Sequence, residues 1–170
     1  MTNKINKVLG RIYIGSGYLA AFFLIAVLIF ILTGISSRIF GFYIRGLAEY
    51  SGYSMAASSF FALAYTFYDK AHIRITLFLE KLNSNKKKFA EIWCLFVASI
   101  FSGYLAFYFS KMTIVSLEFE ERSEGADEIL IWIPQSVVAI GSIIFFICIF
   151  HHLIFSILDK KIKSLCTKYF

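Results

Sequence analysis

The sequence predicts an all-α integral membrane protein, with four transmembrane helices and a horizontal amphipathic helix between the second and the third. The chain is 59% hydrophobic and only 16% charged, and a soluble domain of this length could not bury so much apolar surface. Asp, Glu, Lys and Arg are also absent from four long windows, which comprise residues 12–37, 50–68, 92–110 and 129–158. A helix that crosses a bilayer needs about 20 apolar residues. The outer two windows exceed this length and the middle two just reach it.

These windows predict a single membrane domain over residues 1–170, without a separate soluble domain. The expected spans cover, approximately, residues 12–37, 48–68, 90–112 and 129–158. The first window has a positively charged flank, as a signal peptide has. Its apolar run is nevertheless far longer than the roughly 7–15 residues of a signal core. We therefore expect it to be retained as the first span.

Basic residues alternate between the two sides of these spans. Most of them precede the first span, separate the second from the third, or follow the fourth: Lys4, Lys7, Arg11, Lys70, Arg74, Lys81, Lys86, Lys87, Lys88, Lys160, Lys161, Lys163 and Lys168. Cytoplasmic loops carry such an excess, so both termini are expected in the cytoplasm. The net charge of +6 then indicates topology and attraction to anionic lipid, and no nucleic-acid partner is expected.

Residues 70–83 form the predicted amphipathic helix. At about 100° per residue, most of its apolar side chains gather on one face and its basic side chains line up beside them, while Ile73 and Leu77 interrupt the polar face. Such a helix lies in the plane of the membrane surface. The side chains expected at the lipid interface are Lys70, His72, Arg74 and Lys81.

The loop before the fourth span is acidic. It carries Glu118, Glu120, Glu121, Glu124, Asp127 and Glu128 around Arg122. The predicted topology places this loop outside the cell. Its acidic residues are either simply solvated or form a docking surface for an external partner, in which case Glu118, Glu120, Glu121 and Glu124 would contact that partner.

The spans contain no ionisable residue at mid-depth, where such residues usually mark an ion or substrate path. His151 and His152 are adjacent, so on a helix they point about 100° apart and do not easily face one metal ion. The three cysteines have no C-x-x-C spacing, so neither a disulfide nor a redox centre is expected. We therefore expect no enzyme, no cofactor and no metal, and we do not expect this chain itself to bind the solute.

Small residues recur at helix-packing intervals within the spans. They include Ala98, Ser102 and Ala106, the pair Ser99 and Gly103, and Gly141 in the fourth span. Small residues let helices approach closely in lipid. The contacts are expected among the protein's own helices, and a second interface with another subunit stays open. Pro134 lies in the first turn of the fourth span, where proline costs no helical hydrogen bond.

Several motifs occur in a characteristic order along the chain. Arg38 ends the first span and Glu49 opens the second; the run His72-Ile73-Arg74-Ile75-Thr76-Leu77 follows, and Ile131-Trp132-Ile133-Pro134-Gln135 with Gly141 opens the fourth. This order resembles the small membrane subunit of tripartite ATP-independent periplasmic (TRAP) transporters. The resemblance covers nearly the whole chain. Thr76 stands where the family has an acidic residue, so no carboxylate role carries over to that position.

The resemblance implies a bacterial inner-membrane heterodimer with a large multi-span subunit. A periplasmic binding protein would deliver a carboxylate solute, such as sialic acid or a dicarboxylate, and a sodium gradient would drive its uptake. The large subunit would hold the solute and sodium sites in an elevator-like mechanism, and the small subunit would brace it. Arg38 and Glu49 would lie at the same level and could pair. The full set expected at structural or partner interfaces is Arg38, Glu49, Ser99, Gly103, Trp132, Pro134, Gln135 and Gly141.

Two other functions remain open from the residues alone. The chain could be a small homo-oligomeric exporter, although such a carrier is expected to bury a carboxylate in the membrane. It could also be a membrane anchoring or assembly protein. A membrane-embedded enzyme or redox subunit would need a chemically active group of residues, which the sequence does not offer.

Overall fold

The computed structural model is helical, with four helices in the part of the chain that it describes. These are α1 (Thr2–Ile39), α2 (Leu47–Tyr68), α4 (Ser84–Glu118) and α5 (Trp132–Leu158). The structure describes residues 2–69, 84–123, 125 and 128–158. The predicted amphipathic helix over 70–83 therefore lies outside the described residues.

Three of these helices are long and apolar enough to cross a membrane, namely Lys7–Ile39, Ala90–Glu118 and Trp132–Ile157. At about 1.5 Å per residue, the 38 residues of α1 span about 57 Å, well beyond a hydrocarbon core of about 30 Å. A helix of this length must tilt in the bilayer or project from it. The 22-residue α2 is not among the three, because tyrosine, serine and glycine dilute its hydropathy. The predicted fourth span thus stays a prediction.

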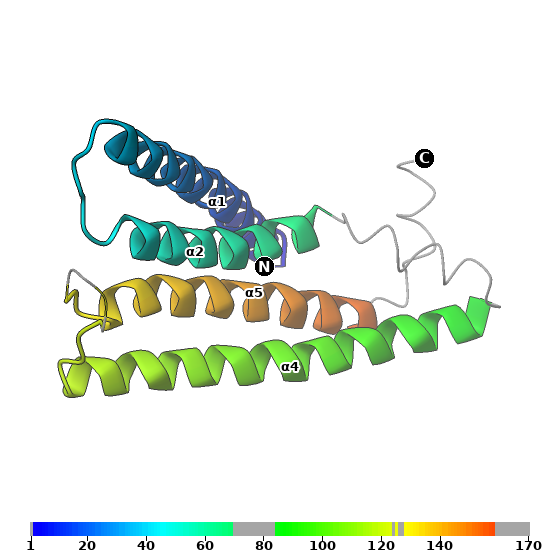
Figure 1. Cartoon of the computed structure of the whole chain (residues 1–170). Helices are drawn as coiled ribbons and strands as arrows, with labels where there is room; N and C mark the ends of the chain where they lie inside the picture. Colours follow the sequence, from blue (N-terminus) through cyan, green and yellow to red (C-terminus); the bar gives the residue numbers. More distant parts are fainter. Residues whose placement is uncertain (1, 70–83, 124, 126–127, 159–170) are drawn as a thin grey trace.

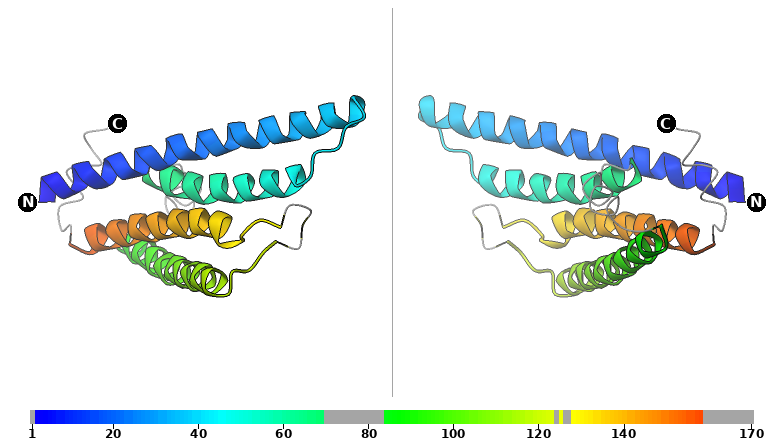
Figure 2. Two further views of the ribbon diagram at one scale, coloured as in Figure 1. Left: turned by 90° about the vertical axis from the view of Figure 1, so that its left-hand side faces the viewer. Right: turned by 90° about the vertical axis from the view of Figure 1, so that its right-hand side faces the viewer.

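The helices lie in single file, in the order α1, α2, α5, α4, rather than around a common axis. Both directions of view show this order (Figures 1 and 2). The main packing contacts agree, since α1 packs on α2, α2 on α5 and α5 on α4. Each helix therefore keeps at least one broad face that no other described helix covers.

The stack is also twisted. In Figure 1, α1 is foreshortened and α4 lies nearly in the plane of the page, whereas in Figure 2 the reverse holds. The helices at the two ends of the stack thus run in clearly different directions. At least one of them must tilt if both cross a bilayer.

The α1–α2 contact combines small residues with aromatic rings. A side chain at Gly17 would meet the Tyr65 ring at 2.8 Å, so glycine lets the ring lie against the α1 backbone. The Ser58 hydroxyl of α2 donates a buried hydrogen bond of 2.9 Å to the Ala20 carbonyl oxygen of α1. This hydroxyl bridges two helices where hydrocarbon would offer it no partner.

The α2–α5 contact depends on Gly141. A Cβ there would lie 2.9 Å from Phe60 Cβ and 3.5 Å from Phe60 and Phe61 backbone atoms. The two helix backbones therefore approach each other closely at this crossing. Further along, the Cys148 thiol lies 3.7 Å from the Ala64 carbonyl oxygen, within reach of a weak S–H hydrogen bond.

The α4–α5 contact contains the small residues of α4. Ser99, Ser102 and Ala106 are buried, and a Cβ at Gly103 would lie 3.1 Å from the Phe146 ring. The structure thus places these residues in the chain's own helix packing.

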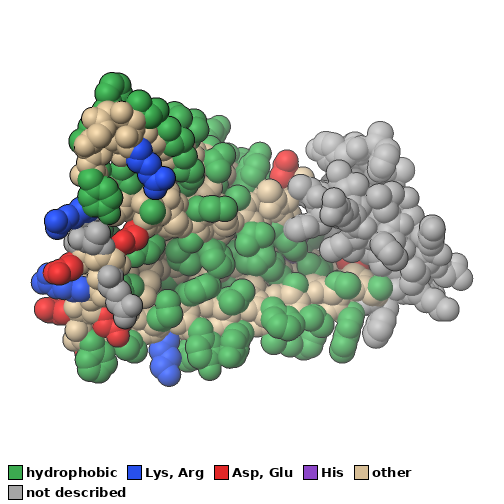
Figure 3. Space-filling model, in the orientation of Figure 1, with side chains coloured by type: hydrophobic (Ala, Val, Ile, Leu, Met, Phe, Trp, Pro, Cys, Tyr) green, Lys and Arg blue, Asp and Glu red, His purple; other side chains and the backbone are tan. Residues whose placement is uncertain are grey.

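The outer surface resembles that of a membrane protein. Figure 3 shows hydrophobic side chains along the helices, a group of charged side chains at the left-hand end, and a few others on the lower edge and beside the grey atoms. That end, on the left in Figures 1 and 3, carries the loops over 40–46 and 119–131 and is called the loop-bearing end below. An apolar band beside a charged end fits insertion of the helices into a bilayer.

Candidate functional site

The candidate site lies at the loop-bearing end, where α2 begins. The residue before the helix, Gly46, has φ 74°, a left-handed conformation that glycine adopts without steric cost. Glu49 follows in the first turn of α2. A negative side chain at this position is stabilised by the unsatisfied backbone N–H groups of the helix terminus.

Glu49 meets the loop over 119–131, which connects α4 to α5. The Ser123 hydroxyl donates a hydrogen bond of 3.3 Å to Glu49 Oε2. The same hydroxyl lies 3.2 Å from the Tyr53 hydroxyl of α2 and accepts the Gly125 backbone N–H at 3.3 Å. We call Glu49, Tyr53, Ser123 and Gly125 the Glu49 cluster. It joins the acidic loop to the start of α2.

Gly125 has no room for a side chain in this arrangement. A Cβ there would collide with both carboxylate oxygens of Glu49. The loop comes this close to α2 because glycine presents only backbone.

The loop is folded back on itself rather than extended. An isolated antiparallel bridge joins Arg122 to Leu130, and the Ser123 N–H donates to the Ile129 carbonyl at 2.7 Å. Glu120 and Glu128 have φ of 48° and 47°, which non-glycine residues adopt infrequently. These contacts and turns join the described residues on the two sides of the loop.

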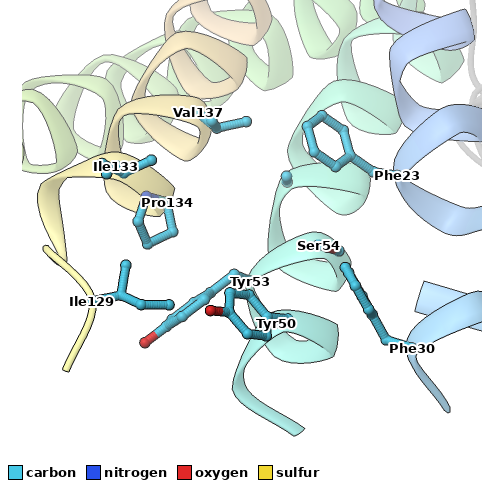
Figure 4. Close-up of a pocket in the computed structure, with 10 residues that line it drawn as sticks. Phe23, Phe30, Tyr50, Tyr53, Ser54, Ile129, Ile133, Pro134 and Val137 are labelled. Atoms are coloured by element: carbon cyan, nitrogen blue, oxygen red, sulfur yellow. The ribbon is translucent and has the colours of Figure 1, made fainter. Parts of the chain in front are cut away.

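A groove opens beside the Glu49 cluster, between α1, α2 and the start of α5 (Figure 4). Its volume is about 180 Å³, and ten residues line it: Phe23, Phe30, Tyr50, Tyr53, Ser54, Ala57, Ile129, Ile133, Pro134 and Val137. No cationic side chain is among them. Such a groove suits an apolar occupant and offers no charge to a carboxylate solute.

The interface residues predicted from sequence lie at different places in the structure. Arg38 is exposed in the last turn of α1, and Trp132 begins α5. Pro134 lines the groove. The Gln135 side-chain oxygen is buried without a hydrogen-bond partner.

The other contact residues predicted from the sequence fall into two groups. Glu118, Glu120 and Glu121 are exposed at the loop-bearing end, where Ser116 Oγ donates to Glu121 Oε2 at 2.7 Å. The remaining predicted contact residues lie outside the described residues: Lys70, His72, Arg74, Lys81 and Glu124. The pairing of Arg38 with Glu49 stays a prediction.

Sequence reasoning did not find the partners of Glu49. Tyr53 lies one helical turn after Glu49, and Ser123 and Gly125 flank an acidic residue in the loop. The one available signal was a glycine within a dense acidic run. That signal indicates a tight backbone approach without saying which segment is approached.

The described residues contain no group of three or more His, Cys, Asp or Glu side chains that could hold a metal ion. The His151 and His152 rings are 5.9 Å apart and nearly perpendicular, at 85°. His152 Nδ1 lies 3.0 Å from the Cys148 carbonyl oxygen of the preceding turn.

The arrangement is that of a membrane-embedded helical protein with an apolar surface and a loop fixed at one end. Residues 25–158 match the model of the family described as tripartite ATP-independent periplasmic transporters, DctQ component. The chain belongs to this family and is the small membrane component of a TRAP transporter, as its sequence motifs predicted. The family is a transporter component family and not an enzyme family. No curated protein and no solved structure gave a significant match.

Proposed function

We propose that this chain braces the large subunit of a sodium-driven TRAP transporter in the bacterial inner membrane and does not itself bind the solute. The transporter imports a carboxylate, of the sialic-acid or dicarboxylate type, which a periplasmic binding protein delivers. The observation that carries the proposal is the single-file order of the helices. It leaves broad apolar faces that another membrane subunit can cover.

The interior of the chain supports a bracing role over a carrier role. A carrier for an anion needs polar or cationic groups that are shielded from lipid. The groove between α1, α2 and α5 is lined by apolar and aromatic residues. Figure 3 shows a group of charged side chains at the loop-bearing end, outside the apolar middle of the helices.

The proposal includes α2 as the fourth span. Its 22 residues extend about 33 Å, which matches a hydrocarbon core of about 30 Å. It packs between α1 and α5, and both of those helices are candidate spans. These two neighbours therefore shield many of the polar side chains of α2 from lipid.

Two further parts of the proposal concern the ends of the spans. The exposed Glu118, Glu120 and Glu121 form part of an outward surface for the binding protein, held in place by the Glu49 cluster. On the cytoplasmic side, Lys70, His72, Arg74 and Lys81 contact lipid phosphates.

Reconstitution tests the proposal directly. The tagged chain, its cognate large subunit and binding protein are purified, and uptake of labelled carboxylates is measured in proteoliposomes with and without a sodium gradient. We expect a one-to-one complex of the two membrane subunits, and uptake only with all three proteins and sodium. Transport by the chain alone would favour the exporter. A homo-oligomer that never binds the large subunit would favour an anchoring protein.

A further inference from the structure

The face of α4 that points away from α5 has unusual chemistry for a lipid-facing surface. α4 stands at one end of the single file (Figure 1), so its neighbour α5 covers one side only. Six large side chains are exposed within 100–108, and all but Leu105 point to the uncovered side at about 100° per residue: Ile100, Phe101, Tyr104, Phe107 and Tyr108. We call these residues the α4 stripe. At about 100° per residue they lie opposite the buried Ser102 and Ala106.

Tyr104 lies close to the middle of its span. The charge-free stretch of α4 covers residues 92–110, and its midpoint is Phe101, one helical turn away. The Tyr104 side chain is 59% exposed and that of Tyr108 is 49% exposed. Their ring centroids are 4.3 Å apart. Even where two hydroxyls share one hydrogen bond, one O–H donor is left over.

Hydrocarbon chains cannot satisfy that donor. An unpaired hydroxyl in an apolar environment costs several kcal/mol by alkane transfer scales, about 4–8 in the extreme case. Tyrosines that face lipid are accordingly enriched at the membrane interfaces, where their hydroxyls reach water. Tyr104 is too deep for this explanation.

The exposed middle parts of α1 and α5 differ from the α4 stripe. In α1 the exposed large side chains around the midpoint are Phe22, Leu24, Ile25, Leu28 and Ile29. In α5 they are likewise hydrocarbon, for example Ile140, Ile143 and Ile147. Lipid tails satisfy such surfaces fully. The exposed Tyr18 of α1 lies about six residues from the middle of its charge-free stretch, toward one end of the span. Among the three candidate spans that the structure describes, Tyr104 is the exposed tyrosine nearest to the middle of its span.

A hollow continues the stripe toward the loop-bearing end. It has a volume of about 400 Å³ and is lined by α4 residues from Tyr108 to Ser116 together with Glu121. Lys111 and Glu121 place opposite charges on its lining. Aromatic residues around a recess, with polar groups at the rim, are typical of protein interfaces.

We propose that the α4 stripe is the surface by which this chain docks on the large membrane subunit. The partner surface presents hydrogen-bond acceptors opposite Tyr104 and Tyr108, and a side chain that enters the hollow beside Lys111. The aliphatic face of α1 is left to lipid. This inference rests on the proposed function, because it takes the large subunit as the occupant.

Photo-crosslinking in native membranes tests the docking face. The chain is co-expressed with its cognate large subunit and carries p-benzoyl-phenylalanine in place of Tyr104 or, as the matched control, in place of Leu28 in the exposed middle of α1. We expect a covalent adduct with the large subunit from position 104 and little or none from position 28. Mass spectrometry of the adduct identifies the partner peptide.

A second measurement isolates the hydroxyls while keeping the rings. Tyr104→Phe with Tyr108→Phe should weaken association with the large subunit by about 3- to 10-fold, as expected for hydrogen bonds between membrane helices. Tyr18→Phe, which removes an exposed hydroxyl from α1, should leave association unchanged.

The possible failures are distinguishable. If the large subunit co-purifies but forms adducts from position 28 and not from position 104, the docking face is wrong and the bracing function stands. Adducts of the chain with itself from position 104 would make a second copy the occupant and overturn the inference. If the two unmodified subunits form no complex, both the inference and the proposed function fail.

Discussion

At the residue scale, Gly125 shows how a missing side chain positions a loop. The Glu49 carboxylate occupies the space that a Cβ of Gly125 would need. Ser123 and Tyr53 complete the contact through hydroxyl groups. Because Glu49 belongs to a helix and Gly125 to the loop, the missing methyl group at Gly125 leaves room for the Glu49 carboxylate where the loop meets α2.

Gly125→Ala should displace the Glu49 carboxylate, which is the flexible end of its side chain, and break its hydrogen bond with Ser123. Loss of one hydrogen bond costs about 0.5–1.5 kcal/mol, so we expect a slightly lower melting temperature in detergent. Amide hydrogen exchange over 119–131 should also be faster than in the wild-type chain. Gly52→Ala is the matched control, since a Cβ at Gly52 meets nothing within 4 Å.

The same clash predicts coupling between two positions. In a Glu49→Ala background the carboxylate is gone, so adding Gly125→Ala should cost little further stability. A double-mutant cycle measures this coupling. An equal cost of Gly125→Ala in both backgrounds would contradict the proposed contact.

At the element scale, the tolerance of each helix crossing to a larger side chain depends on whether its glycine faces a backbone or a side-chain ring. Gly141 brings α5 against Phe60 and the adjoining α2 backbone. Gly103 and Gly17 accommodate rings instead, those of Phe146 and Tyr65. A ring at its flexible end can shift to make room, whereas a backbone can do so only if the whole helix moves. The α2–α5 crossing is therefore the least tolerant of the three.

Gly141→Ala tests this difference. We expect a loss of about 1–3 kcal/mol from overpacking, measured by reversible unfolding in mixed micelles. Adding Phe60→Ala should restore little, because alanine keeps the Cβ atom that a Cβ at position 141 would meet at 2.9 Å. Gly15→Ala in α1, where a Cβ meets nothing within 4 Å, should be neutral or slightly stabilising. A Gly141→Ala variant as stable as Gly15→Ala would refute the close crossing.

The sequence predicts the helices well because charge and hydropathy determine them. The windows at 12–37 and 92–110 mark the apolar middles of α1 and α4, while the helices continue to Thr2–Ile39 and Ser84–Glu118. Hydropathy locates the part that suits a membrane, and helical hydrogen bonding continues into polar flanks such as Lys7 and Arg11. The charge-free window 129–158 lies closer to the observed bounds of α5, Trp132–Leu158, because charged residues flank it directly.

The order of neighbours could not be predicted in the same way. Nothing in the pattern of apolar residues says that α5 lies between α2 and α4, because lipid can cover any apolar face as well as protein can. The contact of Glu49 with Ser123 joins segments 74 residues apart through one weak hydrogen bond. Such a pairing depends on the packed geometry of Gly125 and not on a local motif.

At the scale of the whole molecule, the number of spans determines which termini share a side. Four crossings place both termini on one side, and three place them on opposite sides. The structure puts the 40–46 and 119–131 loops at the same end (Figure 1). Between residue 43 and the start of α4, α2 is the helix that the structure describes. Residues 43 and 87 therefore lie on opposite sides of the membrane only if α2 crosses it.

Cysteine labelling in intact cells measures this arrangement. In a chain with Cys94→Ala and Cys148→Ala, a membrane-impermeant maleimide should label Tyr43→Cys directly, because Tyr43 is exposed in the loop after α1. Lys87→Cys and the native Cys166 should react only after the membrane is permeabilised, as the excess of basic residues on that side predicts. Labelling of Tyr43→Cys and Lys87→Cys from the same side would mean that α2 does not cross. The chain would then have three spans, and Cys166 would lie on the opposite side from the N-terminus.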